Sequence, residues 1–271
     1  MKTIEVTKKE LDTKKWVRTK AYEEHANTLI NEDTLITYKG KPIILYKKLE
    51  TDNNDLRWAV QSVKYSKTER TNGLKTVSTI FGFSPRIAIR NDYCNPTAMS
   101  REFKKQHYVI THFAKTLCEY YKQYFPDLYE KHLKVVEENV HPQWKLKDTP
   151  FTSGIVNKNN ELKYHFDSGN FKGVASNMVV FKSGIEGGRL VCPEYDIKFE
   201  VDDNTLMIFD GQGILHGVTP IKKKSPKAVR YSIVYYSLEQ MKNCLLPQEE
   251  IKRIRKKKLE REVKRINLKW N

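Results

Sequence analysis

The sequence predicts an α+β protein in which a jelly roll of short strands is supported by a layer of helices. Three observations lead to this fold class: short apolar runs between residues 151 and 241, apolar residues at helical spacing between 96 and 142, and a strongly basic helical segment at 245–271. A chain of 271 residues is long enough to bury a sizeable core. We therefore expect a single domain over 1–271, in which residues 1–95 add strands and a helix.

The strand pattern occupies the region from Phe151 to Leu238. The predicted strands are 154–157, 164–166, 177–181, 188–192, 197–201, 205–209, 216–221 and 230–236. Turn-forming residues such as Ser168-Gly169-Asn170 and Gly187-Gly188 separate these runs. About eight short strands at regular spacing are typical of a sandwich or a jelly roll.

The helical pattern precedes these strands. Apolar and aromatic residues recur at helical spacing over 98–125, where Pro126 ends the pattern, and Asp127 is expected to cap a second helix over 127–140. Nearer the N-terminus, the sequence predicts a helix around Lys8–Glu24 and strands at 42–46 and 76–83.

The C-terminal segment is basic and amphipathic. Residues 252–271 hold ten basic and two acidic side chains. Four apolar side chains lie on one side of the predicted helix: Ile251, Ile254, Val263 and Ile266.

The composition bears on the kind of partner. The formal net charge is +16, from 49 Lys and Arg against 33 Asp and Glu. A basic excess this large favours a polyanionic partner, a nucleic acid first and an anionic membrane surface second. Lysine-rich codon usage in an AT-rich genome would produce the same excess without any partner.

The chain lacks the usual signs of a membrane or secreted protein. No stretch approaches the roughly 18 apolar residues that a membrane span requires, and the N-terminus has no apolar signal region. We therefore expect a monomer inside the cell, cytoplasmic or nuclear, or intracellular in a host, without a membrane partner. The four cysteines, at positions 94, 118, 192 and 244, form no CxxC pair, and this spacing predicts reduced thiols.

The motif with the clearest chemistry is H-x-D. Residues i and i+2 of a strand point to the same face, so His165 and Asp167 can reach one ion together. His216, which begins a later predicted strand, is the natural third ligand. Two imidazoles and one carboxylate that leave coordination positions open are typical of non-haem Fe(II) oxygenases.

A carboxylate site is predicted farther along the chain. Arg230 and Ser232 share one face of the last strand, and together they can hold a carboxylate through a guanidinium fork and a hydroxyl. A dicarboxylic 2-oxo acid needs such an anchor at its end remote from the metal. The alternative for Arg230 is a strand arginine that faces solvent.

These residues belong to a longer resemblance. The span from Phe151 to Met241 resembles the 2-oxoglutarate oxygenase superfamily and, within it, the TET/JBP family of nucleic-acid 5-methylpyrimidine dioxygenases, especially phage and other microbial members. The shared residues are Tyr164-His165-Phe166-Asp167-Ser168-Gly169-Asn170, Gly187-Gly188-Arg189-Leu190 with Pro193, Phe209-Asp210-Gly211-Gln212, His216-Gly217-Val218-Thr219-Pro220 and Arg230-Tyr231-Ser232.

The resemblance implies a double-stranded β-helix at 151–241 that uses Fe(II), 2-oxoglutarate and O2. The implied reaction hydroxylates the 5-methyl group of a pyrimidine in DNA: 5-methylcytosine to 5-hydroxymethylcytosine and beyond, or thymine to 5-hydroxymethyluracil. The target base would be flipped out of the duplex or already single-stranded. The resemblance also makes Asn157 a candidate for binding the 2-oxo acid, although a turn-forming role beside Asn159-Asn160 explains this residue equally well.

Other polar residues are candidates for reading the base or the backbone. Asn170, Asp210 and Gln212 lie near the predicted ligand strands, and an ionised Asp210 would accept from the C4 amine of methylcytosine. A turn-forming role for Asp210 is the alternative. The candidates for contact with phosphates are Lys222, Lys223, Lys224, Lys227, Arg86 and Arg90. These cations could equally be solvated.

Two other functions remain open at this point. One is a 2-oxoglutarate oxygenase that acts on a protein side chain or a small metabolite, which the metal motif alone does not exclude. The other is a non-catalytic jelly-roll protein that binds nucleic acid and has structural histidines.

Overall fold

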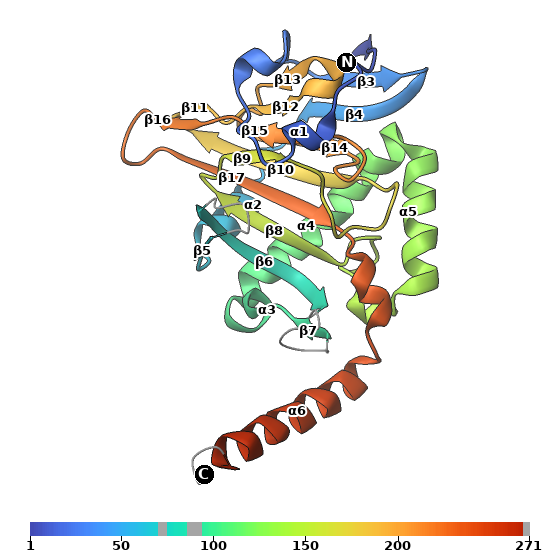
Figure 1. Cartoon of the computed structure of the whole chain (residues 1–271), viewed down its shortest axis with the longest axis vertical. Helices are drawn as coiled ribbons and strands as arrows, with labels where there is room; N and C mark the ends of the chain where they lie inside the picture. Colours follow the sequence, from blue (N-terminus) through green and yellow to red (C-terminus); the bar gives the residue numbers. More distant parts are fainter. Residues whose placement is uncertain (70–74, 86–93, 268–271) are drawn as a thin grey trace.

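The computed structural model of the chain describes residues 1–69, 75–85 and 94–267. Within these ranges, two β-sheets pack face to face, helices cover the outer side of the larger sheet, and one long helix projects from the body (Figure 1). This arrangement is the α+β jelly roll that the sequence predicts. No helix among the described residues is long and apolar enough to cross a bilayer.

The described strands form a large sheet, a small sheet and a two-stranded ribbon. The large sheet has the order β1 (Lys2–Glu5), β3 (Thr34–Tyr38), β4 (Lys41–Lys48), β14 (Thr205–Phe209), β10 (Ser176–Ser183), β17 (Val229–Tyr236), β8 (Ser153–Lys158), β6 (Lys75–Pro85) and β5 (Ser66–Glu69), with β7 (Cys94–Pro96) paired to β6. The small sheet has the order β2 (Thr28–Ile30), β13 (Ile197–Phe199), β12 (Leu190–Cys192), β15 (His216–Val218) and β9 (Leu162–His165). The ribbon pairs β11 (Ile185–Gly187) with β16 (Ile221–Lys223).

Three of the described α-helices, α3, α4 and α5, follow one another in the chain between strands β7 and β8. The α-helices are α1 (Thr13–Trp16), α2 (Asn54–Gln61), α3 (Ala98–Glu102), α4 (Lys104–Tyr124), α5 (Pro126–Asn139) and α6 (Pro247–Asn267). Short 3-10 turns lie at η1 (Glu23–His25), η2 (Pro142–Trp144), η3 (Pro193–Tyr195) and η4 (Glu239–Asn243).

The middle of the large sheet is buried on both faces, and strand β14 shows how. Leu206 and Ile208 pack into the core beneath the helical layer, whereas Met207 and Phe209 pack into the core between the two sheets. All five residues of β14 are buried, so the strand reads as a continuous apolar run and not as an alternating one. Full burial of each such side chain contributes about 1.5–3 kcal/mol.

Several predicted boundaries differ from the structure. The strand predicted at 216–221 is two strands, β15 and β16, because Thr219-Pro220 interrupts it. The strand predicted at 188–192 starts only at β12, and the helix predicted over 98–125 is divided at Phe103 into α3 and α4. Pro126 begins α5 instead of preceding it, since its missing N–H is no loss at the first helical position.

The helix predicted around Lys8–Glu24 is wrong. Only α1 and the turn η1 form there, and the rest of the segment is irregular. Arg18 N–H donates to the carbonyl of Tyr164, and Tyr164 N–H donates to the carbonyl of Thr19. Trp16 and Val17 also pack against Tyr164 and its neighbours. These tertiary contacts outweigh the weak local preference for helix.

The expectation of reduced thiols is also wrong for one pair. Cys94 and Cys244 form a disulfide whose Cα atoms are 5.5 Å apart, although 150 residues separate them in sequence. Cys94 begins β7, and Cys244 follows η4 after the last strand. The chain after β17 returns to the vicinity of β7, so the two cysteines lie within disulfide range. Cys118 and Cys192 are free and buried.

Candidate active site

A cavity of about 300 Å³ lies between the two sheets. Apolar side chains from both sheets line it, including Ile155, Met178, Leu190, Phe209 and Val218. The predicted site residues His165, Asp167, His216, Arg230, Ser232, Asn157 and Asn170 also line it. The volume is at the lower end of the range that small-molecule sites occupy.

The three predicted metal ligands converge at this cavity. The candidate ligand atoms of His165, Asp167 and His216 all lie within 4.8 Å of one another. Asp167 Oδ1 is 3.6 Å from His165 Nε2 and 3.9 Å from His216 Nε2. The two histidines are cross-strand partners in β9 and β15, which explains how residues 51 positions apart meet. This donor set fits a single Fe(II) and leaves one face open.

The histidine rings are oriented by the backbone. His165 Nδ1 lies 2.8 Å from the carbonyl oxygen of Lys163, and His216 Nδ1 lies 2.9 Å from that of Ile214. Because a carbonyl oxygen can only accept, each Nδ1 carries the proton, and each Nε2 keeps the lone pair that a metal requires. Burial lowers the pKa of His216 to about 4, so its imidazole is neutral near pH 7.

A tight turn holds the carboxylate of Asp167. The backbone N–H of Asp167 donates to the carbonyl of Gly211 at 2.8 Å. A Cβ atom on Gly211 would clash with the carboxylate of Asp167, so a larger residue at this position would displace that carboxylate. The ring of His216 meets Phe209 edge to face at 5.0 Å, which restricts the imidazole from the other side.

Arg230 is the most unusual side chain in the cavity. It is 1% exposed, and its Nε and Nη2 atoms are buried without a hydrogen-bond partner among the described residues. Burial lowers the pKa of Arg230 from 12.5 to about 10, so the guanidinium is still charged near pH 7. An unpaired buried cation costs several kcal/mol, and a bound carboxylate would relieve that cost. The solvent-facing alternative for Arg230 is therefore wrong.

Two neighbouring side chains could complete a carboxylate site. Ser232 is buried on the same face of β17 as Arg230 and lies opposite Asn157 of β8. Asn157 Oδ1 accepts from Asn160 Nδ2 at 3.1 Å, which orients the Asn157 NH2 group as a donor. Val234 and Tyr236 continue the same alternation into the cavity, and the spacing of the last strand could have predicted this.

The three candidates for reading the base are not equivalent. Asn170 lines the cavity, and its Nδ2 donates to Ser176 Oγ at 3.2 Å. The other two candidates are outside the cavity lining. Asp210 Oδ1 accepts from the backbone N–H groups of Gln212 and Gly213, and Gln212 Nε2 donates to the carbonyl of Asn170. These bonds support the turn-forming role of Asp210, and its contact with a base stays a prediction.

The basic candidates are placed only in part. Lys222, Lys223, Lys224 and Lys227 are exposed on the ribbon and on the loop that precedes β17. Arg86 and Arg90 lie outside the described residues. Sequence reasoning missed Ser168 and Met178, which also line the cavity. No motif distinguishes Met178 from any other apolar residue of β10.

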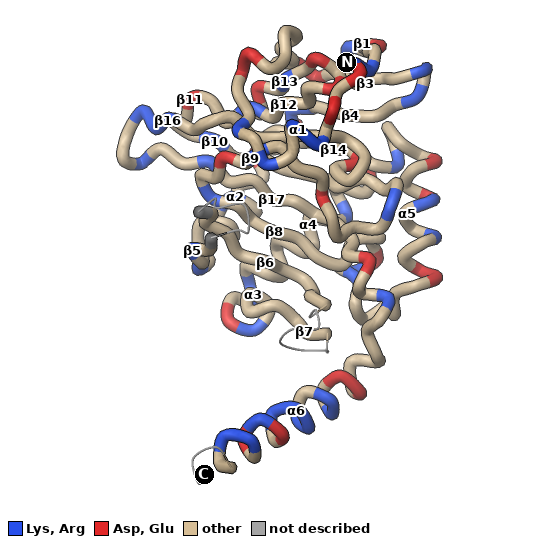
Figure 2. Tube along the Cα trace, in the orientation of Figure 1, with Lys and Arg blue, Asp and Glu red and all other residues tan. Residues whose placement is uncertain are grey.

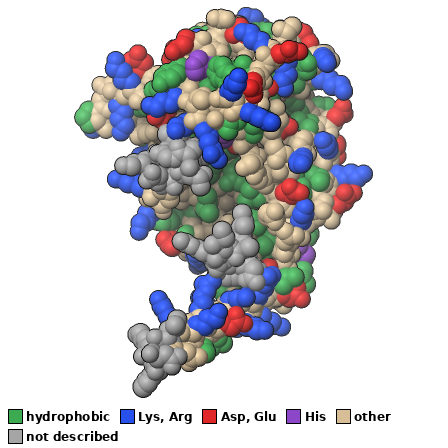
Figure 3. Space-filling view, viewed as in Figure 1, with side chains coloured by type: hydrophobic (Ala, Val, Ile, Leu, Met, Phe, Trp, Pro, Cys, Tyr) green, Lys and Arg blue, Asp and Glu red, His purple; other side chains and the backbone are tan. Residues whose placement is uncertain are grey.

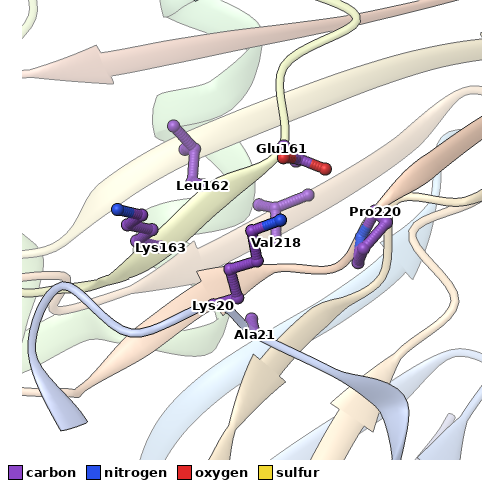
Figure 4. Close-up of a pocket in the computed structure, with 7 residues that line it drawn as sticks. All are labelled: Lys20, Ala21, Glu161, Leu162, Lys163, Val218 and Pro220. Carbon is purple, nitrogen blue, oxygen red and sulfur yellow. The ribbon is translucent and has the colours of Figure 1, made fainter. Parts of the chain in front are cut away.

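A second hollow lies near Lys20 and Ala21, beside β9 and β15 (Figure 4). Its volume is about 10 Å³, which is the space of one water molecule at most. Lys163 and Glu161 lie at its edge. It is too small for a substrate or a cosubstrate.

Two facing sheets with a cavity between them place the protein in the jelly-roll fold class. A solved structure described as NgTET1 in complex with 5mC DNA has the same fold: its TM-score is 0.59 at 15% identity, over 80% of this chain and 84% of that one. The family profile of Tet_JBP, described as "Oxygenase domain of the 2OGFeDO superfamily", matches residues 90–239. The chain therefore belongs to the Tet_JBP family.

Relatives from Trypanosoma brucei brucei share this region. The bifunctional helicase and thymine dioxygenase JBP2 is 30% identical over 120 residues, which are 44% of this chain and 11% of JBP2. The thymine dioxygenase JBP1 is 24% identical over 170 residues, which are 62% of this chain and 20% of JBP1. The chain thus spans only a fifth or less of the length of these relatives.

Proposed function

We propose that this protein is an Fe(II)- and 2-oxoglutarate-dependent dioxygenase that hydroxylates the 5-methyl group of a pyrimidine in DNA. The observation that carries the proposal is Arg230, a buried cation whose Nε and Nη2 have no hydrogen-bond partner in the described part of the chain, and which lines the same cavity as a two-histidine, one-carboxylate group. A dicarboxylic 2-oxo acid satisfies both features at once, because one end needs a metal and the other end needs a cation.

The residues of the chain have distinct tasks in this proposal. His165, Asp167 and His216 hold Fe(II), and when iron, 2-oxoglutarate and O2 are bound they supply the oxidising chemistry that converts a C–H bond into C–OH. Arg230 anchors the distal carboxylate by a charge-assisted fork. Ser232 and the Asn157 NH2 group donate to the same cosubstrate. The apolar lining keeps water away from the reacting methyl group.

DNA is the proposed substrate for three reasons. The family profile covers more than half of the chain, the curated relatives are thymine dioxygenases, and the net charge is +16. A base inside a duplex cannot reach a cavity between two sheets, so the target is flipped out or single-stranded. Both 5-methylcytosine and thymine carry the methyl group at the same ring position. A protein side chain or a small metabolite would not explain the charge.

Nucleoside mass spectrometry tests the proposal. The protein is incubated with Fe(II), 2-oxoglutarate and oligonucleotides that contain either thymine or 5-methylcytosine as the only 5-methylpyrimidine. We expect a hydroxymethylated nucleoside from one of the two, together with succinate. His165→Ala is the matched control and should form neither product. Succinate formation without any modified nucleoside, with a protein or metabolite acceptor consumed instead, would refute the DNA substrate.

A further inference from the structure

Strand β17 connects the cavity with two basic surface elements of the protein. Arg230, Ser232, Val234 and Tyr236 of this strand all line the cavity. Immediately before β17 come β16 and its loop, which carry the basic cluster Lys222–Lys224 with Lys227. Shortly after β17, beyond η4, comes the basic helix α6. Each end of the strand that lines the site thus leads directly into a cationic element (Figure 2).

The basic ribbon is an ordered structure. Glu186 pairs with Lys222 and Ile185 pairs with Lys223 in the antiparallel register of β11 and β16. The N–H of Lys224 donates to the carbonyl of Gly184 at 2.9 Å, which closes the ribbon. Because this backbone is hydrogen-bonded, the ribbon holds its lysines at one end of β17 at little cost in backbone entropy on binding, with Lys222 and Lys223 on opposite faces of the strand.

Helix α6 is attached firmly at its first turn. The Cys94–Cys244 disulfide lies just before it, and Trp144 Nε1 donates to the carbonyl of Leu245 at 2.9 Å. Glu250 is buried at 1% exposure and accepts from the N–H of Leu245 at 3.0 Å. These contacts fix the direction in which the helix leaves the body.

The exposed part of α6 carries a basic stripe. Residues three and four apart lie on the same side of a helix, and four basic residues follow this spacing: Arg253, Lys257, Arg261 and Lys264. The stripe is about 16 Å long at 1.5 Å per residue. On the face shown in Figure 3, basic side chains of α6 lie below the body and those of the ribbon region lie at its upper left.

We infer that the duplex on either side of the target base is held by two separate cationic contacts, the ribbon on one flank and the α6 stripe on the other. This inference rests on the proposed function, which supplies DNA as the partner. Strand β17 has eight residues, so its ends are about 26 Å apart, or roughly eight base pairs. The ribbon and the segment that leads to α6 therefore leave the body at opposite ends of the strand that lines the cavity, which is the arrangement that contact with both flanks requires.

DNA fits α6 better than the other occupants. A second copy of the chain would pack on the exposed apolar side chains Ile251, Leu259 and Val263, and would leave the charge of the basic stripe unmatched. An acidic protein could match the charge, but it would not account for a second cationic element at the opposite end of the cavity strand. A polyanion that is longer than 26 Å accounts for both.

Fluorescence anisotropy with three duplexes tests the inference. One duplex has long flanks on both sides of the target base, and each of the other two lacks one flank. The stripe variant is R253Q/K257Q/R261Q/K264Q, and the ribbon variant is K222Q/K223Q/K224Q. The matched control is K104Q/K105Q/K134Q, which removes exposed charges from the helical layer behind the large sheet.

The expected result is a reciprocal pattern. The slope of log affinity against log salt should fall by up to about 3.6 in the stripe variant and about 2.7 in the ribbon variant, at 0.9 per phosphate contact. Each variant should bind more weakly than the parent to the two duplexes that contain the flank contacted by its altered element. On the third duplex, from which that flank is missing, the variant and the parent should have the same affinity. The control should bind all three duplexes like the parent.

Two results would overturn the inference. One is a pair of basic variants that bind all three duplexes as the control does. The other is a parent protein that is a dimer in solution, together with a loss of DNA binding in the variant I251Q/L259Q/V263Q. This pair of observations would assign α6 to contact with a second copy of the chain. The proposed function can fail independently of this inference. If the variants show the reciprocal binding pattern but the parent forms no modified nucleoside, the two-flank contact is supported and the dioxygenase activity on DNA is refuted.

Discussion

Replacing Arg230 should affect ligand binding and stability in opposite directions. The side chain is 1% exposed, and its Nε and Nη2 have no hydrogen-bond partner among the residues that the structure describes. The fall in its pKa from 12.5 to about 10 corresponds to about 3 kcal/mol of unfavourable burial at 1.36 kcal/mol per unit. Arg230→Met keeps the volume and removes the charge. We expect the ligand-free protein to gain about 1–4 kcal/mol in free energy of unfolding.

The same substitution should weaken binding of 2-oxoglutarate. Loss of one partner of a buried, hydrogen-bonded charge pair costs about 2–5 kcal/mol, which is about thirtyfold to several thousandfold in Kd. Ser232→Ala removes one hydroxyl and should cost about two- to tenfold. Anaerobic calorimetric titration of the Fe(II)-loaded protein measures the affinity, and urea unfolding without ligand measures the stability. A variant that binds 2-oxoglutarate like the parent, or that unfolds more easily, would refute the role of Arg230.

Three further predictions concern the metal, the pH and the disulfide. Gly211→Ala should displace Asp167 and weaken Fe(II) binding by about five- to a hundredfold. Gly169→Ala is the control, because its added Cβ would lie 3.5 Å from the nearest side chain, and it should leave Fe(II) affinity unchanged. Equal Fe(II) affinities of the two variants would contradict the predicted displacement of Asp167. Burial lowers the pKa values of His107 and His216 to about 4 and that of His132 to about 3, below 6.5. The unfolded chain therefore binds more protons than the folded protein between pH 6.5 and 4. The free energy of unfolding should be highest above pH 6.5, and each of the three histidines should lower it by about 1.4 kcal/mol at pH 5.5. Urea unfolding of the metal-free protein measures this, and a free energy of unfolding that is constant from pH 7.5 to 5.5 would argue against the prediction. Cys244→Ser should lower the free energy of unfolding by about 2–5 kcal/mol under oxidising conditions and by nothing in reductant, because the disulfide closes a 150-residue loop.

The parts of the site that a single strand contains could be predicted well. His165 with Asp167 follows from backbone geometry, because alternate side chains of a strand share a face. The same rule places Arg230 beside Ser232, and it extends to Val234 and Tyr236. The candidates in turns were less predictable. Asp210 and Gln212 have the right polarity, but their partners are neighbouring backbone groups, and composition cannot distinguish a turn from a binding site.

Local residue patterns predict most of the elements and the donor types within them, through apolar runs and helical spacing, although they fail at residues 8–24. Local patterns do not reveal which distant elements meet. The tertiary structure pairs His216 with His165 across β15 and β9, places Gly211 against Asp167, and joins Cys94 to Cys244. The physical reason is that periodicity follows from local backbone geometry, whereas these contacts follow from the order of strands in two sheets, which is set by the packing of the whole core.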